Sequence, residues 1–332
     1  ASNNTGVGYR SLYTNTTGTS NCAVGTNALR DNVTSSNNTA VGKDALKLNT
    51  AAANTAVGFA ALEASTSGEK NVAIGSGSML LNTTGEKNVA IGSDCLDANT
   101  IGTQNVAVGA SALGKNTTAS NNTAVGRLAL FENTTGTANT AVGANALDAN
   151  TTASNNTAIG NYTLGDNTTG TNNTALGRDA LGSNTTASNN TALGYDALQL
   201  NTTGTQNTAV GALALDANTT AGDNTAVGYA ALGSNTTGGS NTAVGHIALL
   251  VNTTGQFNTA VGRGALDANT TANNNSAFGY FALGSNTTGT GNTALGQSAL
   301  TANTTASNNT AVGKDCCVSC TTGAGNTDVG HR

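Results

Sequence analysis

A five-residue motif, Asn-Thr-Ala-Val-Gly or a close variant, recurs about every 17 residues along the whole chain. Of the steps between its 20 closing glycines, eighteen span 17 residues, and the step from Gly42 to Gly58 spans 16. A fixed period of this kind is typical of a repeat architecture, in which each unit packs only against its neighbours. We therefore predict a single repeat domain over residues 1–332. Because the chain opens in mid-repeat, we expect it to be a piece of a longer protein.

One repeat reads Asn-Thr-Ala-Val-Gly-x-x-Ala-Leu-x-x-Asn-Thr-Thr-Gly/Ala-x-x, as in residues 122–138. The apolar residues form two short segments, Thr-Ala-Val and Ala-Leu, and no repeat has apolar residues at helical spacing. Gly and Asn-Thr-Thr-Gly indicate turns after these segments. The sequence predicts an all-β fold, a parallel β-solenoid (β-roll) of about 20 coils of 17 residues with two short strands per coil. Coils about 4.8 Å apart would stack into a rod roughly 95 Å long.

Two columns of the repeat vary almost only among apolar side chains, which is typical of core positions. They are the residue before the glycine and the residue after the second Ala: Val41, Leu46, Val125, Leu130, Val142 and Leu147. Side chains alternate along an extended segment, so Val and the neighbouring Ala face opposite ways. With Val inside, the alanines would form an outward stripe that packs against another chain, at Ala40, Ala124 and Ala141. The alternative is a solitary solenoid with these alanines inside.

The asparagine that opens the motif is present in all 20 copies. We expect it to form a ladder of side-chain amides bonded between coils, a structural role rather than a ligand site. This predicted Asn ladder includes Asn21, Asn38, Asn71, Asn122, Asn139, Asn173, Asn207, Asn241 and Asn309. A second asparagine follows the glycine by seven residues in most copies, as at Asn116, although Ser65 replaces it once. The two residues after the glycine vary freely, and we expect them to be exposed.

Charge and hydrophobicity exclude several classes of partner. Charged residues make up 9% of the chain, against roughly 25% in an average protein. With a net charge of -5 and no cluster of Lys and Arg, we expect no nucleic-acid partner. Apolar runs are only a few residues long, so we expect no insertion into a membrane.

No set of residues suggests catalysis. His246 and His331 lie far apart in the stack, and neither has a carboxylate and a nucleophile placed by the repeat. Four aspartates recur at one turn position and are interpreted as turn residues: Asp97, Asp148, Asp216 and Asp267. The repeat also lacks the Gly-Gly-x-Gly-x-Asp unit of calcium-binding β-rolls. We expect no enzymatic activity, no cofactor and no metal.

The cysteines fall into two groups. Cys22 stands where other repeats have Thr or Val, and Cys95 stands where they have Ala. We expect both to be small buried apolar residues. Cys316, Cys317 and Cys320 form a cluster near the end of the chain, where His331 is the nearest histidine, which makes a poor zinc site. A disulfide near the terminus and simple decay of the repeat remain as alternatives.

Some repeats resemble known families. Asn71-Val72-Ala73-Ile74-Gly75 and residues 88–92 resemble the repeats of YadA-like heads in trimeric autotransporter adhesins. That resemblance implies left-handed parallel β-rolls, with slightly shorter coils, assembled as trimers. The full 17-residue unit is similar to repeats in phage and virus tail fibres and in secreted bacterial surface proteins.

These features predict a structural shaft of an extracellular fibre, at a cell surface or on a virion. The expected partner is the chain itself, as a lateral homo-oligomer such as a trimer or as an end-to-end filament. Exposed loops would offer weak multivalent attachment to cell-surface glycans or receptors. The alternative function is ice binding by a solenoid that presents ranks of Thr, from doublets such as Thr117-Thr118. Since adjacent residues of a strand face opposite ways, only one rank of each doublet would face outward.

Overall fold

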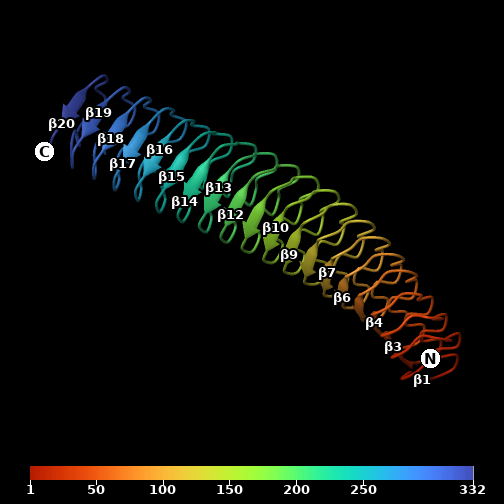
Figure 1. The fold of residues 1–332 in the computed structure, drawn as a ribbon. Coiled ribbons are helices and arrows are strands. Elements are labelled where there is room, and N and C mark those ends of the chain that lie inside the picture. Colours follow the sequence, from red (N-terminus) through yellow and green to blue (C-terminus); the bar gives the residue numbers. More distant parts are fainter. Residues whose placement is uncertain (332) are drawn as a thin grey trace. The chain divides into compact units, whose positions relative to one another are not determined.

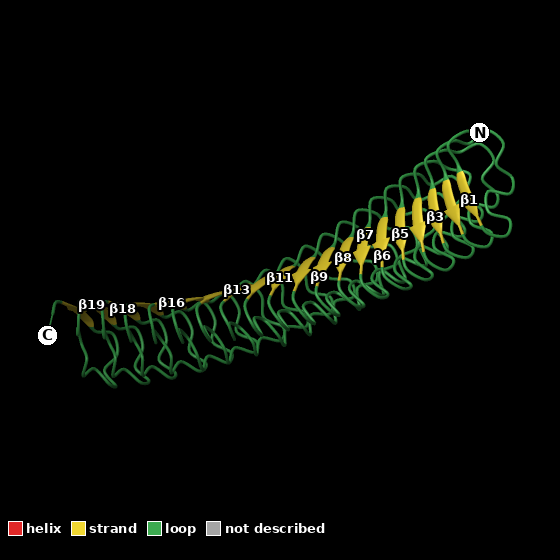
Figure 2. Ribbon diagram, turned by 90° about the horizontal axis from the view of Figure 1, so that it is seen from below, coloured by secondary structure: helices red, strands yellow, loops and turns green. Residues whose placement is uncertain are grey.

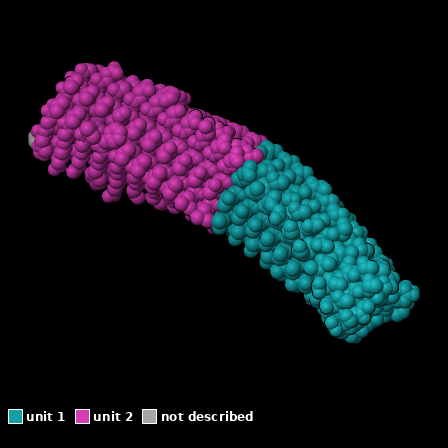
Figure 3. Space-filling model, viewed as in Figure 1, with its two compact units in different colours: residues 1–169 teal, residues 170–332 magenta. Residues whose placement is uncertain are grey.

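The computed structural model describes residues 1–331, which contain 20 short strands and no helix. The chain divides into two units, residues 1–169 and residues 170–332, which are coloured separately in Figure 3. Each unit holds ten strands, one per repeat, and every strand is three residues long. Each strand covers the second to fourth residue of the motif, as Thr123-Ala124-Val125 does in β8.

The strands of unit 1 are β1 (Thr5–Val7), β2 (Cys22–Val24), β3 (Thr39–Val41), β4 (Thr55–Val57), β5 (Val72–Ile74), β6 (Val89–Ile91), β7 (Val106–Val108), β8 (Thr123–Val125), β9 (Thr140–Val142) and β10 (Thr157–Ile159). The strands of unit 2 are β11 (Thr174–Leu176), β12 (Thr191–Leu193), β13 (Thr208–Val210), β14 (Thr225–Val227), β15 (Thr242–Val244), β16 (Thr259–Val261), β17 (Ser276–Phe278), β18 (Thr293–Leu295), β19 (Thr310–Val312) and β20 (Thr327–Val329).

Within each unit, every strand pairs in parallel with the strand of the next coil. The register places equivalent residues side by side, so that Thr123 lies opposite Thr140 and Ala124 lies opposite Ala141. The strands form one row along the coils of each unit, and turns make up the rest of every coil (Figures 1 and 2). The predicted all-β parallel solenoid with 17-residue coils is confirmed.

The expected second strand does not form. The Ala-Leu segment is a series of turns, because two residues at or next to this segment in each coil adopt the left-handed region of backbone space. In one coil these are Leu128, with φ 58°, and Leu130, with φ 53°. A strand needs extended residues in succession, and this alternation interrupts it. The backbone still bonds to the next coil, since the N–H of Leu130 donates to the carbonyl oxygen of Ala146 at 2.9 Å.

The motif glycine is required where the chain leaves the strand. Gly109 has φ 131°, and a Cβ built on it would lie 2.6 Å from the carbonyl oxygen of Gly126 in the next coil. Only glycine adopts this backbone region without strain, and only glycine permits so close an approach of two coils. The constancy of this position thus follows from the stacking distance.

The interior is lined by small residues and one large apolar column. The leucines expected in the core are fully buried there: Leu46, Leu130 and Leu147 are 0% exposed. The prediction for the other two columns was wrong. The alanines expected on the outside are 0% exposed, at Ala40, Ala124 and Ala141. The valines expected in the core lie on the outside, at Val41, Val125 and Val142, and the first two are each 36% exposed.

Space inside the coil explains this reversal. In β1, Gly6 stands where almost all other strands have their inward alanine. A Cβ built on Gly6 would lie 3.5 Å from Cδ1 of Leu12. It would also lie 3.1 Å from Oγ of Ser11, at the position of the second alanine. A methyl group therefore already fills the space opposite the leucine column. An isopropyl group would overpack it, so the valine must take the outward side of the strand.

Candidate functional surfaces

The predicted Asn ladder is present, and it lies inside the coils. The backbone N–H of Asn38 donates to Oδ1 of Asn21 at 3.0 Å, and Oδ1 of Asn38 accepts from the N–H of Asn54 at 2.9 Å. Nδ2 of Asn38 donates to the carbonyl oxygen of Ala51 at 2.9 Å. All predicted members are at most 2% exposed: Asn21, Asn38, Asn71, Asn122, Asn139, Asn173, Asn207, Asn241 and Asn309. These amides bond to backbone groups and are closed to outside ligands, although Nδ2 of Asn309 has no partner.

A second ladder runs beside the first. Nδ2 of Asn116 donates to Oδ1 of Asn99 at 3.0 Å and to the carbonyl oxygen of Ala119 at 3.1 Å. Ser65 replaces one member, and its buried hydroxyl is left without a partner. Both ladders hold neighbouring coils together inside the molecule. Surfaces that could bind another molecule therefore lie on the outside of the coils.

The first outside surface is the outward side of the strands, which we call the strand face. It consists of the first and third residue of each strand, so β8 contributes Thr123 and Val125. The third position holds Val, Ile, Leu or Phe, and many of these side chains are 36–41% exposed, for example Ile74, Leu176 and Phe278. No strand from β1 to β20 has a charged residue at either position.

The second surface is the column of residues that follow the motif glycine. Unit 2 gathers aromatic and cationic side chains there, and they pair between coils. The guanidinium of Arg178 lies 5.6 Å from the ring centre of Tyr195, and that of Arg263 lies 5.8 Å from the ring of Tyr280. The rings of Tyr229 and His246 stack with centroids 5.3 Å apart.

The expected exposure holds for the first of the two residues after the glycine in most coils, as at Lys43. The second residue ranges from buried, as at Asp44 with 9% exposed, to exposed, as at Tyr162 with 49% exposed. Sequence reasoning also missed the aromatic and cationic pairs. The available signal was the 17-residue spacing that puts Arg178 one coil from Tyr195.

The third surface is the turn that carries the Thr doublets. The hydroxyl of Thr117 donates to the carbonyl oxygen of Thr134 in the next coil at 3.3 Å, while Thr118 is exposed. The same division recurs in the following coil, where Thr134 donates to Thr151 at 3.1 Å and Thr135 is exposed. The first threonine of each doublet therefore bonds to the next coil, and the second faces outward.

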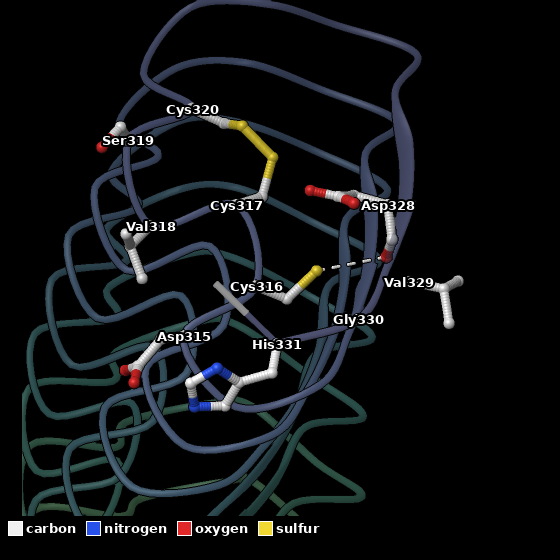
Figure 4. A pocket seen from close by; sticks show the side chains of 10 residues that line it. All are labelled: Asp315, Cys316, Cys317, Val318, Ser319, Cys320, Asp328, Val329, Gly330 and His331. Carbon is white, nitrogen blue, oxygen red and sulfur yellow. Dashed lines mark hydrogen bonds between the residues drawn. A yellow bond between two sulfur atoms is a disulfide. The ribbon is translucent and has the colours of Figure 1, made fainter.

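The cysteine cluster lines a cavity of about 310 Å³ in the last described coil (Figure 4). Cys317 and Cys320 form a disulfide, one of the two alternatives left open by the sequence. The thiol of Cys316 donates to the carbonyl oxygen of Asp328 at 3.3 Å, and burial raises its pKa. The full lining is Asp315, Cys316, Cys317, Val318, Ser319, Cys320, Asp328, Val329, Gly330 and His331.

The other cysteines differ from each other. Cys95 is fully buried as expected, donates to the carbonyl oxygen of Ala107 at 3.2 Å, and has a pKa raised to about 12, chiefly by burial. Cys22 was expected to be buried but is only half-buried, because it occupies the first, outward position of β2.

The four recurring aspartates are spread over separate coils. Burial is the main cause that raises the pKa of each carboxyl, although backbone N–H groups oppose it, at Asp97, Asp148, Asp216 and Asp267. Among residues 1–331, no group of three or more His, Cys, Asp or Glu side chains is close enough to hold a metal ion.

In the same described residues, no helix has the length and hydrophobicity needed to cross a membrane. No protein-family model matches the chain, and the comparison with curated proteins also gave no match.

Proposed function

We propose that this chain is a structural shaft of an extracellular fibre or filament, of the kind found in tail fibres, adhesins and secreted surface filaments. One observation carries the proposal. The interior repeats almost without change in coil after coil, with one buried leucine and two asparagine amides in most coils. Variation falls on exposed columns such as the residue after the glycine. A sequence that keeps its stacking residues and varies its surface favours a spacer over a chemical site.

The exposed columns support a secondary role in attachment. A side chain repeated in successive coils would give many weak contacts at fixed spacing, and linked weak contacts produce a strong overall attachment. The Tyr and Arg pairs of unit 2 are the best candidates for such contacts with cell-surface glycans or receptors.

Immunogold electron microscopy of native cells or virions tests the shaft directly. Antibodies raised against the intact chain are expected to decorate filaments that project from the surface. Label confined to the cell interior would contradict the proposal.

A second candidate function is ice binding, which the exposed rank of Thr118 and Thr135 favours, since identical hydroxyls repeat there at the coil spacing. The rank sits in a turn, where the flat surface of a sheet is missing, so this candidate stands behind the shaft. A thermal-hysteresis assay on the intact chain decides it, and the absence of hysteresis would remove it.

A further inference from the structure

The strand face is an uncharged surface that runs along each unit. It was expected inside the molecule, and the reversal of Val and Ala leaves it outside. In unit 1 its third column holds Val24, Val41, Ile74, Ile91, Val125 and Ile159, which are 36–39% exposed. Single exposed apolar residues are ordinary on a protein surface, but a continuous column over successive paired strands is not.

Charge is excluded from this face throughout. The chain has 12 Lys and Arg residues and 17 Asp and Glu residues, and none of them stands at the first or third position of a strand. Protein surfaces that stay free of other chains usually carry interspersed charged residues. Apart from Asp328 at the second position of β20, the charges of residues 1–331 lie outside the strands, so no like charges meet directly when two strand faces approach.

The strand face of a single unit is large enough for a small specific contact. Ten strands about 4.8 Å apart, each about 10 Å long, give roughly 480 Å² of flat face per unit in projection. One unit therefore offers somewhat more than half of the roughly 800 Å² that each partner buries in an interface of standard size.

The face is also complementary to itself. Equivalent residues stand side by side in the register, Thr123 by Thr140 and Val125 by Val142, so each column has one chemistry and one spacing. Two such faces can meet with their ranks interdigitated, as paired sheets do about 10 Å apart. A two-fold axis would bring the same patch of both copies together.

We propose that the strand face is the surface through which this chain pairs face to face with a second copy of itself. The inference rests on the proposed function, because a shaft built from paired solenoids is one way to make such a fibre. The pairing places Thr and Val, Ile or Leu in the contact and leaves the aromatic and cationic column free for attachment.

The test compares two triple variants of the intact chain by light-scattering mass and analytical ultracentrifugation. The face variant carries Val125→Glu, Val142→Glu and Ile159→Glu, on three successive strands. The control variant makes the same change of charge in neighbouring coils on the exposed Thr rank, as Thr118→Glu, Thr135→Glu and Thr152→Glu. Circular dichroism of both variants checks that the coils still form.

The wild type and the control variant are expected to have twice the chain mass of 32.4 kDa. The face variant is expected to be monomeric, with pairing weakened roughly a hundredfold or more, because each Glu would be buried without a partner. A monomeric wild type, a trimeric wild type, or equal dissociation of both variants would overturn the pairing.

A separate variant covers the case in which the glutamates prevent folding. Because Cys22 already lies on the strand face, the variant combines Cys22→Thr with Val125→Cys in the intact chain, and mild oxidation is expected to link two chains through the new thiol. Failure to cross-link, while Thr118→Cys does cross-link, would contradict the proposal. If the wild type is a monomer of elongated shape, the pairing fails and the shaft survives. A compact particle would instead remove the shaft.

Discussion

At the scale of single residues, the buried asparagines decide which side of each strand faces inward. Asn122 lies 0% exposed with its amide bonded inside the coil, and alternation then turns Thr123 out, Ala124 in and Val125 out. The hydrogen bonds of the asparagine cannot be moved to the outside without leaving buried backbone groups unpaired. A polar residue, rather than an apolar one, therefore sets the orientation of the strand.

Replacing one member of the Asn ladder tests this role. Asn122→Ala leaves the buried N–H of Asn139 without its acceptor, which lies at 2.9 Å, and removes a donor to Gly136. We expect local opening to become easier by roughly 2 to 3 kcal/mol. Native-state hydrogen exchange at the amide of Asn139 measures it.

The matched control is the neighbouring exposed residue, Asn121→Ala. Ala138 occupies the same column one coil later with φ 56°, so alanine fits this backbone. Exchange is expected to change little in the control. Equal effects of the two substitutions would show that the ladder contributes nothing specific.

At the scale of the coil, the period and its turns could be predicted from the sequence, but the inward side and the second strand could not. Counting apolar residues favoured Val over Ala for the core, because it ignored the volume already taken by Leu130 and two asparagine side chains. The constant Asn122, read with the alternation of the strand, would have given the correct side. Nothing in the Ala-Leu segment signals left-handed residues, since leucine rarely adopts that region.

The corrected core makes a prediction about neighbouring residues of β8. Ala124→Val would overpack the coil and is expected to cost about 1 to 3 kcal/mol. Val125→Thr changes an outward side chain of similar size and is expected to cost less than about 1 kcal/mol. Thermal unfolding of both variants shows which substitution costs more stability. A larger loss for Val125→Thr than for Ala124→Val would indicate that the valine lies in the core.

The turn aspartates predict how stability depends on pH. Burial raises the folded pKa of Asp97 and its three equivalents above the usual 3.8, so the folded state favours the protonated form. Stability from these groups is then fully present below the unfolded pKa and is lost as pH rises through the folded pKa.

A fourfold Asp→Asn variant at Asp97, Asp148, Asp216 and Asp267 removes this loss. Its melting temperature is expected to exceed that of the wild type at pH 7, with the difference vanishing below about pH 3. Melting curves across this range test it. A wild type that melts above the variant at pH 7 would show that the carboxylates are stabilised by folding instead.

At the scale of the whole molecule, the coils of a solenoid share their stability with their neighbours. One coil buries a single leucine and two small alanines, too little to order 17 residues alone, so each coil depends on its neighbours. Such a stack grows by adding coils and keeps the same surface along its length. Each added repeat therefore lengthens the stack, and a shaft is a function that depends on length.

Small-angle X-ray scattering of the intact chain in solution tests this claim most directly. Twenty coils stacked in one series about 4.8 Å apart predict a length of roughly 95 Å and a radius of gyration of at least about 27 Å per chain. A compact globule of 332 residues would have a radius of gyration of about 20 Å. The larger value, with a rod-like scattering profile, is the predicted result, and the smaller value would contradict the solenoid shaft.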